Sequence, residues 1–111
     1  MTADPQVLVQ RQLDAYNAHN LNDFLDCYAE DVCVRELASN DVIAQGKPAM
    51  RELYASLFES SPLLHARVLT RITEGHTVVD HEEVEGLGDT IERTVAIYRI
   101  EGATIQDVWF A

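Results

Sequence analysis

The C-terminal half of the chain consists of four long segments rich in Val, Ile, Thr and Tyr, joined by short turns. The segments span residues 64–73, 77–85, 90–100 and 104–110, and the turns between them contain Gly75, Gly86, Gly88 and Gly102. Runs of this composition are typical of β-strands. Because short turns connect strands that run in opposite directions, the sequence predicts an antiparallel meander of four strands.

Helical patterns dominate the N-terminal half. Asp4 followed by Pro5 is a typical helix start, and apolar residues then recur at helical spacing to residue 18. Asn20 is predicted to cap a second helix whose apolar stripe ends with Tyr28. The remaining segments are a short strand over 32–37, a polar turn over 38–45 and a third helix over 46–60. This order of elements predicts a single α+β domain over residues 1–111.

The strand over 90–100 is apolar on both faces. One face carries Ala96, Tyr98 and Ile100, and the other carries Ile91, Val95 and Ile97. The helices can cover only one face of the sheet, so we expect a homodimer packed through the other, convex face. Strand parity in 104–110 places Ile105, Asp107 and Trp109 on the dimer side and Val108 and Phe110 inside.

Composition limits the possible partners. A formal net charge of −11 repels phosphate backbones and anionic lipids, so no nucleic-acid or membrane partner is expected. The chain has neither an apolar run of roughly 20 residues nor a secretory signal, which favours a cytoplasmic location. Cys27 and Cys33 are predicted to be buried free thiols, and no metal or cofactor motif is present.

Four stretches, taken in order, resemble the nuclear transport factor 2-like superfamily. They are residues 13–21, the Tyr-Ala-Glu-Asp-Val run at 28–32, the Arg-Glu-Leu-Tyr run at 51–54 after Gly46, and residues 100–105 together with the Val-Trp-Phe run at 108–110. The chain looks most similar to the SnoaL-like polyketide cyclases and ketosteroid-isomerase-like proteins. The resemblance implies a cone-shaped fold, in which a curved antiparallel sheet wraps around three N-terminal helices and encloses an apolar pocket.

The resemblance also implies roles for individual residues. Glu36 falls where the ketosteroid isomerases carry their catalytic base, and Tyr28 and Tyr54 fall on tyrosines that support their pocket. The two donors that hold the enolate oxygen in those enzymes fall on Gln12 and Ala96. Since losing one such donor typically costs on the order of 10²–10³ in rate, the resemblance does not extend to steroid isomerisation.

The densest group of acid–base residues lies at 80–83. Alternation puts Asp80 and Glu82 on one strand face, and comparison with the isomerases favours that face as the inner one. The sequence therefore suggests Glu36 or Asp80 as the acid–base group. The ligand-binding candidates are Gln12, Tyr16, Tyr28, Tyr54, Glu82 and Tyr98. We expect an isomerase, cyclase or hydrolase acting on a small apolar, oxygenated ligand, and the alternative is a non-catalytic binding or dimerisation module.

Overall fold

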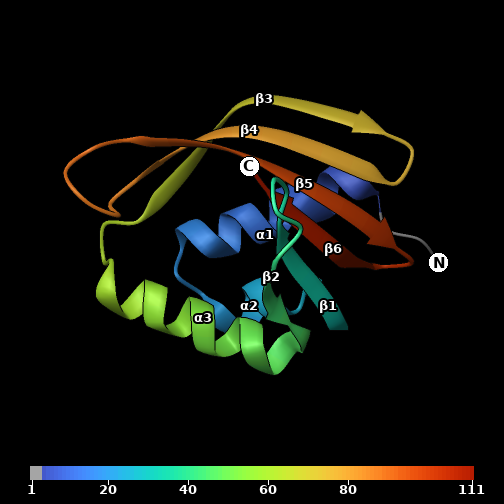
Figure 1. Cartoon of the computed structure of the whole chain (residues 1–111), viewed down its shortest axis with the longest axis horizontal. Helices are drawn as coiled ribbons and strands as arrows, with labels where there is room; N and C mark the ends of the chain where they lie inside the picture. Colours follow the sequence, from blue (N-terminus) through green and yellow to red (C-terminus); the bar gives the residue numbers. More distant parts are fainter. Residues whose placement is uncertain (1–3) are drawn as a thin grey trace.

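The computed structural model describes residues 4–111, and these residues form three helices and six strands (Figure 1). The elements of the first half are α1 (Pro5–Asn17), α2 (Leu21–Leu25), β1 (Tyr28–Glu36), β2 (Val42–Gln45) and α3 (Gly46–Ser60). Those of the second half are β3 (His65–Glu74), β4 (Thr77–Glu85), β5 (Glu92–Glu101) and β6 (Thr104–Phe110). The predicted α+β class is confirmed, and the predicted order of elements holds except for the additional strand β2.

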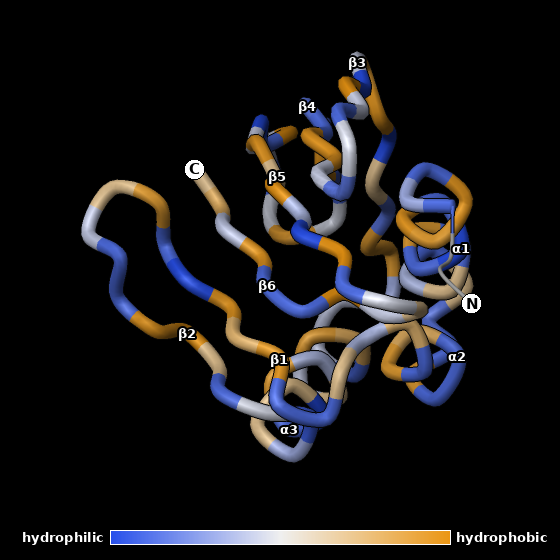
Figure 2. The backbone as a smooth tube through the Cα atoms, turned by 90° about the vertical axis from the view of Figure 1, so that its right-hand side faces the viewer, coloured by the Kyte–Doolittle hydropathy of each residue, from blue (hydrophilic) through white to orange (hydrophobic). Residues whose placement is uncertain are grey.

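All six strands form one curved sheet in the order β2-β1-β6-β5-β4-β3. The predicted antiparallel meander is present, because β3, β4, β5 and β6 pair with one another in chain order. β1 joins the sheet parallel to β6, and β2 lies antiparallel to β1 at the edge. Figure 2 shows the hairpin of β1 and β2 extending away from the helices.

The two predicted helix caps are confirmed. The Asp4 side chain accepts hydrogen bonds from the backbone N–H groups of Gln6 and Val7, which have no partner within the first turn of α1. The Asn20 side chain accepts one from the backbone N–H of Asp23 at 3.1 Å, so α2 begins where the sequence predicts.

The end of α2 differs from the prediction. The helix stops at Leu25, and Tyr28 is the first residue of β1 instead of the last residue of a helical stripe. Pairing with β6 is the reason, since the Ile105 N–H donates to the Cys27 carbonyl at 2.8 Å and Tyr28 lies opposite Ile105. This long-range pairing outweighs the local helical spacing. Cys27 and Cys33 are both buried and free, as predicted.

The polar turn predicted over 38–45 is also wrong in part. Val42–Gln45 form β2, in which Ala44 lies opposite Val34. Val42 and Ile43 suit an extended backbone, and the long β1 strand supplies the hydrogen-bonding partner that makes the strand stable.

A third correction concerns β6. Trp109 lies opposite Ile97 on the convex face, as predicted for Trp109, but Ile105 is fully buried in the core. The pairing between β5 and β6 shifts between Arg99 and Ile100, so β6 contains an extra residue there. One extra residue reverses the face of every side chain beyond it, which turns Ile105 inward.

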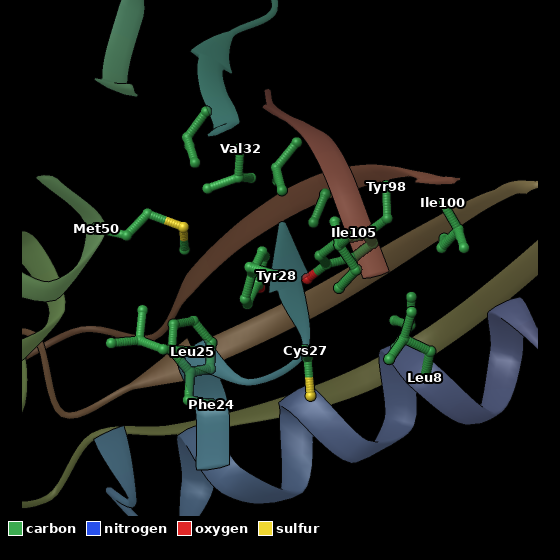
Figure 3. Packing of buried hydrophobic residues seen from close by; sticks show 14 of the residues in the cluster. Leu8, Phe24, Leu25, Cys27, Tyr28, Val32, Met50, Tyr98, Ile100 and Ile105 are labelled. Carbon is green, nitrogen blue, oxygen red and sulfur yellow. The ribbon is translucent and has the colours of Figure 1, made fainter. Parts of the chain in front are cut away.

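The core lies between the concave face of the sheet and the helices. Leu8 of α1, Phe24 of α2 and Met50 of α3 meet Tyr28 and Val32 of β1 in one buried cluster (Figure 3). In Figure 1 the long strands β3, β4 and β5 arch over α1, with α3 on the far side of that helix. None of the helices within residues 4–111 is long and apolar enough to cross a bilayer.

The convex face carries a continuous apolar row. We define the row as Ile72, Val79, Ile97 and Trp109, which are successive cross-strand neighbours on β3, β4, β5 and β6. Ion pairs lie on the same face: Asp107 with Arg35 and Arg99 next to the row, and Glu83 with Arg67 and Arg93 beyond the intervening pair of His81 and Val95. Both arginines of β5, Arg93 and Arg99, thus pair with acidic residues of adjacent strands. Ile91 is exposed and lies just before β5, outside the row.

Candidate functional site

A cavity of about 330 Å³ opens between the helices and the concave face of the sheet. Its aromatic lining consists of Tyr16, Phe24, Tyr28, Tyr54, Tyr98 and Phe110. Aliphatic side chains come from Leu13, Leu57, Ala66, Val84 and Leu87, and the polar lining is Gln12, Glu82, Glu92 and Thr94. A mostly apolar cavity with a few converging polar groups is the usual form of a small-molecule site.

Glu82 is the buried carboxyl group of this cavity. β4 alternates strictly between its two faces, so Asp80 and Glu82 both point inward, as the sequence favoured. The Glu82 residue is only 6% exposed, and burial, together with the nearby Asp80 charge, raises its pKa from 4.5 to about 7. Among residues 4–111, Glu82 forms no ion pair with a basic side chain. Its carboxyl group can therefore gain or lose a proton near neutral pH.

Asp80 is in a different environment, although it lies only two residues away. Both of its carboxylate oxygens accept hydrogen bonds from the Arg71 guanidinium, at 2.7 and 2.9 Å. Arg71 also donates to the side chain of Gln10 on α1 at 2.9 Å. Asp80 is completely buried and is not part of the cavity lining. The pair therefore joins β3, β4 and α1 behind the cavity and leaves Glu82 as the buried carboxyl group that faces it.

Gln12 connects two of the tyrosines. The Tyr28 hydroxyl donates to the Gln12 side-chain oxygen at 2.8 Å, and the Gln12 amide donates to the Tyr98 hydroxyl at 3.2 Å. Tyr98 accepts in this bond, so its own proton remains available to a ligand. The three residues come from α1, β1 and β5, and each is at most 3% exposed. Burial raises the pKa of both tyrosines well above the usual value, which keeps the hydroxyls neutral donors.

Tyr16 and Tyr54 complete the polar side of the cavity. Their rings lie 6.3 Å apart edge to face, and Phe24 packs 4.7 Å from Tyr54. Burial and the charge of Glu82 raise the pKa of both tyrosines. The three tyrosines predicted to converge, Tyr16, Tyr28 and Tyr54, do line one cavity.

Glu36 does not lie where the sequence comparison suggested. It ends β1 opposite Phe110, is exposed, and is absent from the cavity lining. β1 continues outward into the hairpin with β2, which carries Glu36 away from the helices. Burial therefore cannot convert Glu36 into a general base.

Several residues of the site were missed by the sequence reasoning. Arg71 could have been found, because counting back from the turn at Gly75 and His76 places it opposite Asp80. Leu87 and Glu92 line the cavity from the loop between β4 and β5 and from the start of β5. No local pattern identifies them, since their position depends on how that loop packs. Gly86 has a φ of +88°, and a Cβ there would lie 2.4 Å from the Leu63 carbonyl group.

His19 is half-buried and makes contacts outside its own turn. It lies in the turn between α1 and α2 with a φ of +56°, and its Nε2 is 2.8 Å from the Leu64 carbonyl oxygen. Its ring stacks on Phe58 of α3 at 5.1 Å. His19 therefore links the turn between α1 and α2 to α3 and to Leu64, the residue just before β3. Within residues 4–111, no group of three His, Cys, Asp or Glu side chains is arranged to hold a metal ion.

Residues 9–108 match the family model described as SnoaL-like domain. No curated protein matches the sequence. An uncharacterised cystatin-fold protein from Novosphingobium aromaticivorans is 24% identical, with a TM-score of 0.89 over 98% of both chains.

Two further structures share the fold at lower identity. A candidate polyketide cyclase from Sinorhizobium meliloti is 14% identical, with a TM-score of 0.83 over 98% of this chain and 100% of that one. A hypothetical protein with a ketosteroid isomerase-like fold from Catenulispora acidiphila, solved in complex with trimethylamine, is 15% identical. Its TM-score is 0.78 over 100% of this chain and 86% of that one. At these sequence identities the structural likeness shows a shared fold and nothing more specific.

Proposed function

This chain belongs to the SnoaL-like domain family, and we propose that its cavity performs acid–base chemistry on a small, mostly apolar ligand. Glu82 accepts and returns the proton, and Tyr98 donates a hydrogen bond to an oxygen of the ligand. The observation that carries the proposal is the carboxyl group of Glu82, a residue only 6% exposed, which has no ionic partner and lies in an aromatic cavity of about 330 Å³. Glu82 thus takes the role that the sequence suggested for Glu36 or Asp80.

The pKa of Glu82 suits this role. A general acid–base is most effective when its pKa is near the working pH, and burial with the Asp80 charge raises that of Glu82 to about 7. The matching reaction class is proton transfer at a carbon next to a carbonyl group, as in an isomerisation or a cyclisation. Ala96 is fully buried at the position of the second oxyanion donor of the steroid isomerases, so we do not propose that activity.

The test combines a titration with an exchange reaction. We expect the Glu82 carboxyl to titrate near pH 7 by NMR, and the protein to accelerate deuterium exchange of the acidic C–H groups of 2-tetralone. Glu82→Gln should lose the acceleration, while Glu85→Gln, at the exposed end of the same strand, should keep it. A Glu82 pKa near 4.5 would overturn the acid–base role.

A non-catalytic binding module is the second candidate. It is favoured by the Tyr28–Gln12–Tyr98 network, in which a neutral amide occupies the place of a stronger oxyanion donor. A raised Glu82 pKa without any exchange of 2-tetralone or a comparable ketone would support this candidate. The trimethylamine complex of the Catenulispora acidiphila protein supports the idea that this fold accommodates small ligands.

We also propose that the convex face binds a second copy of the chain. The apolar row would otherwise lie in water. Four of the eight Lys and Arg residues form ion pairs on the same face, namely Arg35, Arg67, Arg93 and Arg99. Because these arginines balance the acidic groups of this face, two copies can approach through it despite a net charge of −11 each.

A further inference from the structure

We infer that the ligand of the cavity is a small cation, a tertiary or quaternary ammonium on an apolar body, and that the cavity rejects anions. The inference rests on the proposal that the cavity binds a small ligand, and it names the chemical class of that ligand. Two observations carry it: the sign of the charges at the cavity, and the aromatic character of its walls.

All charged side chains that line the cavity are acidic. They are Glu82 inside and Glu92 at the start of β5, and among the described residues no Lys, Arg or His lines the cavity. Arg71, whose charge acts on Glu82 from behind the lining, is held by both oxygens of Asp80, so the pair contributes little net charge. A carboxylate or phosphate on the ligand would therefore be buried beside a like charge with no cationic partner, which is strongly unfavourable.

The walls favour one kind of cation. Aromatic faces attract cations whose charge lies within about 6 Å of the ring centre. Phe24 and Tyr54 lie 4.7 Å apart, and Tyr16 lies 6.0 and 6.3 Å from them, so the rings form one continuous wall. Burying a cation beside Glu82 requires its removal from water. This cost is lowest for an alkylated ammonium, which has few or no N–H groups to lose hydrogen bonds.

The charge of Glu82 makes the selection dependent on pH. The titratable and charged groups around it come from each neighbouring element: Asp80 on β4, Arg71 on β3, Tyr98 and Glu92 on β5, Tyr16 on α1, Tyr28 on β1 and Tyr54 on α3. The tyrosines stay neutral, because burial raises their pKa. An ammonium beside Glu82 stabilises the ionised carboxylate, which is the form that accepts a proton.

The test compares three ligands of similar shape: benzyltrimethylammonium, benzyl alcohol and benzoate. Binding is measured by calorimetry in buffer with about 0.15 M salt, which screens attraction to the acidic surface. We expect the cation to bind at least about tenfold more tightly than the alcohol near pH 8, and benzoate not to bind. Because this cation cannot lose a proton, a fall of about thirtyfold in its affinity between pH 8 and 5.5 would report protonation of Glu82.

Glu82→Gln should remove the preference for the cation and its dependence on pH, while Glu85→Gln should retain both. The inference is overturned if benzoate binds as tightly as the cation, if the alcohol equals the cation, or if none of the three binds. It is also overturned if the pH dependence survives in Glu82→Gln. The acid–base proposal fails by a different result, namely a Glu82 pKa near 4.5 in the unliganded protein. The preference of the cavity for a cation over an anion can still be measured in that case.

Discussion

At the scale of single residues, Glu82 links the candidate site to the stability of the fold. Its pKa is raised from 4.5 to about 7 in the folded protein, mainly by burial. The folded state therefore holds a proton that the unfolded chain has already released between these two values. The contribution of Glu82 to stability is fully present below about pH 4.5 and is lost as the pH rises to about 7.

Glu82→Gln removes this loss, because the amide carries no charge at any pH. The variant should resemble the unmodified protein in stability at low pH, and should exceed it by up to about 3 kcal/mol above pH 7. Urea unfolding of the two proteins over a pH series measures the difference. A difference that does not change with pH would show that Glu82 is solvated in the folded protein.

Asp80 is predicted to act on Glu82 through its charge and its hold on Arg71. Asp80→Asn leaves a mostly buried guanidinium without its bidentate partner, which should cost about 2–4 kcal/mol of the free energy of unfolding. The Glu82 pKa should fall at the same time, because a like charge is removed and the Arg71 charge is no longer neutralised.

Urea unfolding and an NMR titration of Glu82 measure these two effects. Glu101→Gln is the matched control, since it removes a carboxylate from an exposed ion pair with Arg99 and should change neither quantity appreciably. An unchanged Glu82 pKa in Asp80→Asn would contradict electrostatic coupling between the two carboxyl groups.

At the scale of structural elements, the loop between β4 and β5 closes one side of the cavity through Leu87. Gly86 holds this loop against the connection between α3 and β3. Its φ of +88° is unfavourable for any other residue, and an added Cβ would meet Leu63 and Leu64 backbone atoms at 2.4 to 2.5 Å. The position of Leu87 therefore depends on a backbone approach that only glycine permits.

Gly86→Ala should destabilise the protein by about 1–3 kcal/mol or more, because the strained backbone and the clash must both be relieved. Gly88→Ala, two residues later in the same loop, is the matched control. A Cβ at Gly88 meets no atom within 4 Å, so the change should be neutral or slightly stabilising. Thermal unfolding compares them, and equal midpoints for the two variants would contradict the close approach at Gly86.

At the scale of the whole molecule, the apolar row on the convex face determines the expected assembly. Ile97 is the centre of the row, because it pairs with Val79 on one side and Trp109 on the other. We expect a dimer at micromolar concentration by sedimentation, and Ile97→Asp should convert it to a monomer, since a charge would be buried without a partner. Val7→Asp, at an exposed apolar position on α1, should leave the dimer intact. A monomeric unmodified protein would exclude this interface.

Much of the fold follows from local patterns. The caps at Asp4 and Asn20, the alternation in β4 and the short turns of the meander each act over a few residues, so the sequence alone identifies them. Where pairing is long-range, the local patterns fail. Tyr28 leaves the predicted helix because β1 pairs with β6, and Ile105 turns inward because of one extra residue in β6.

The same distinction applies to the candidate site. Strand parity places Asp80 and Glu82 on the same face, and only the resemblance to the isomerases favoured that face as the inner one. Helical spacing directs Tyr16 and Tyr54 toward the core. Which carboxyl group is available to a ligand is decided by the tertiary structure. Arg71 crosses from the neighbouring strand to neutralise Asp80, while the cavity leaves Glu82 without an ionic partner. The reactivity of a buried charge depends on groups distant in the sequence, because desolvation and Coulomb interactions act through space instead of along the chain.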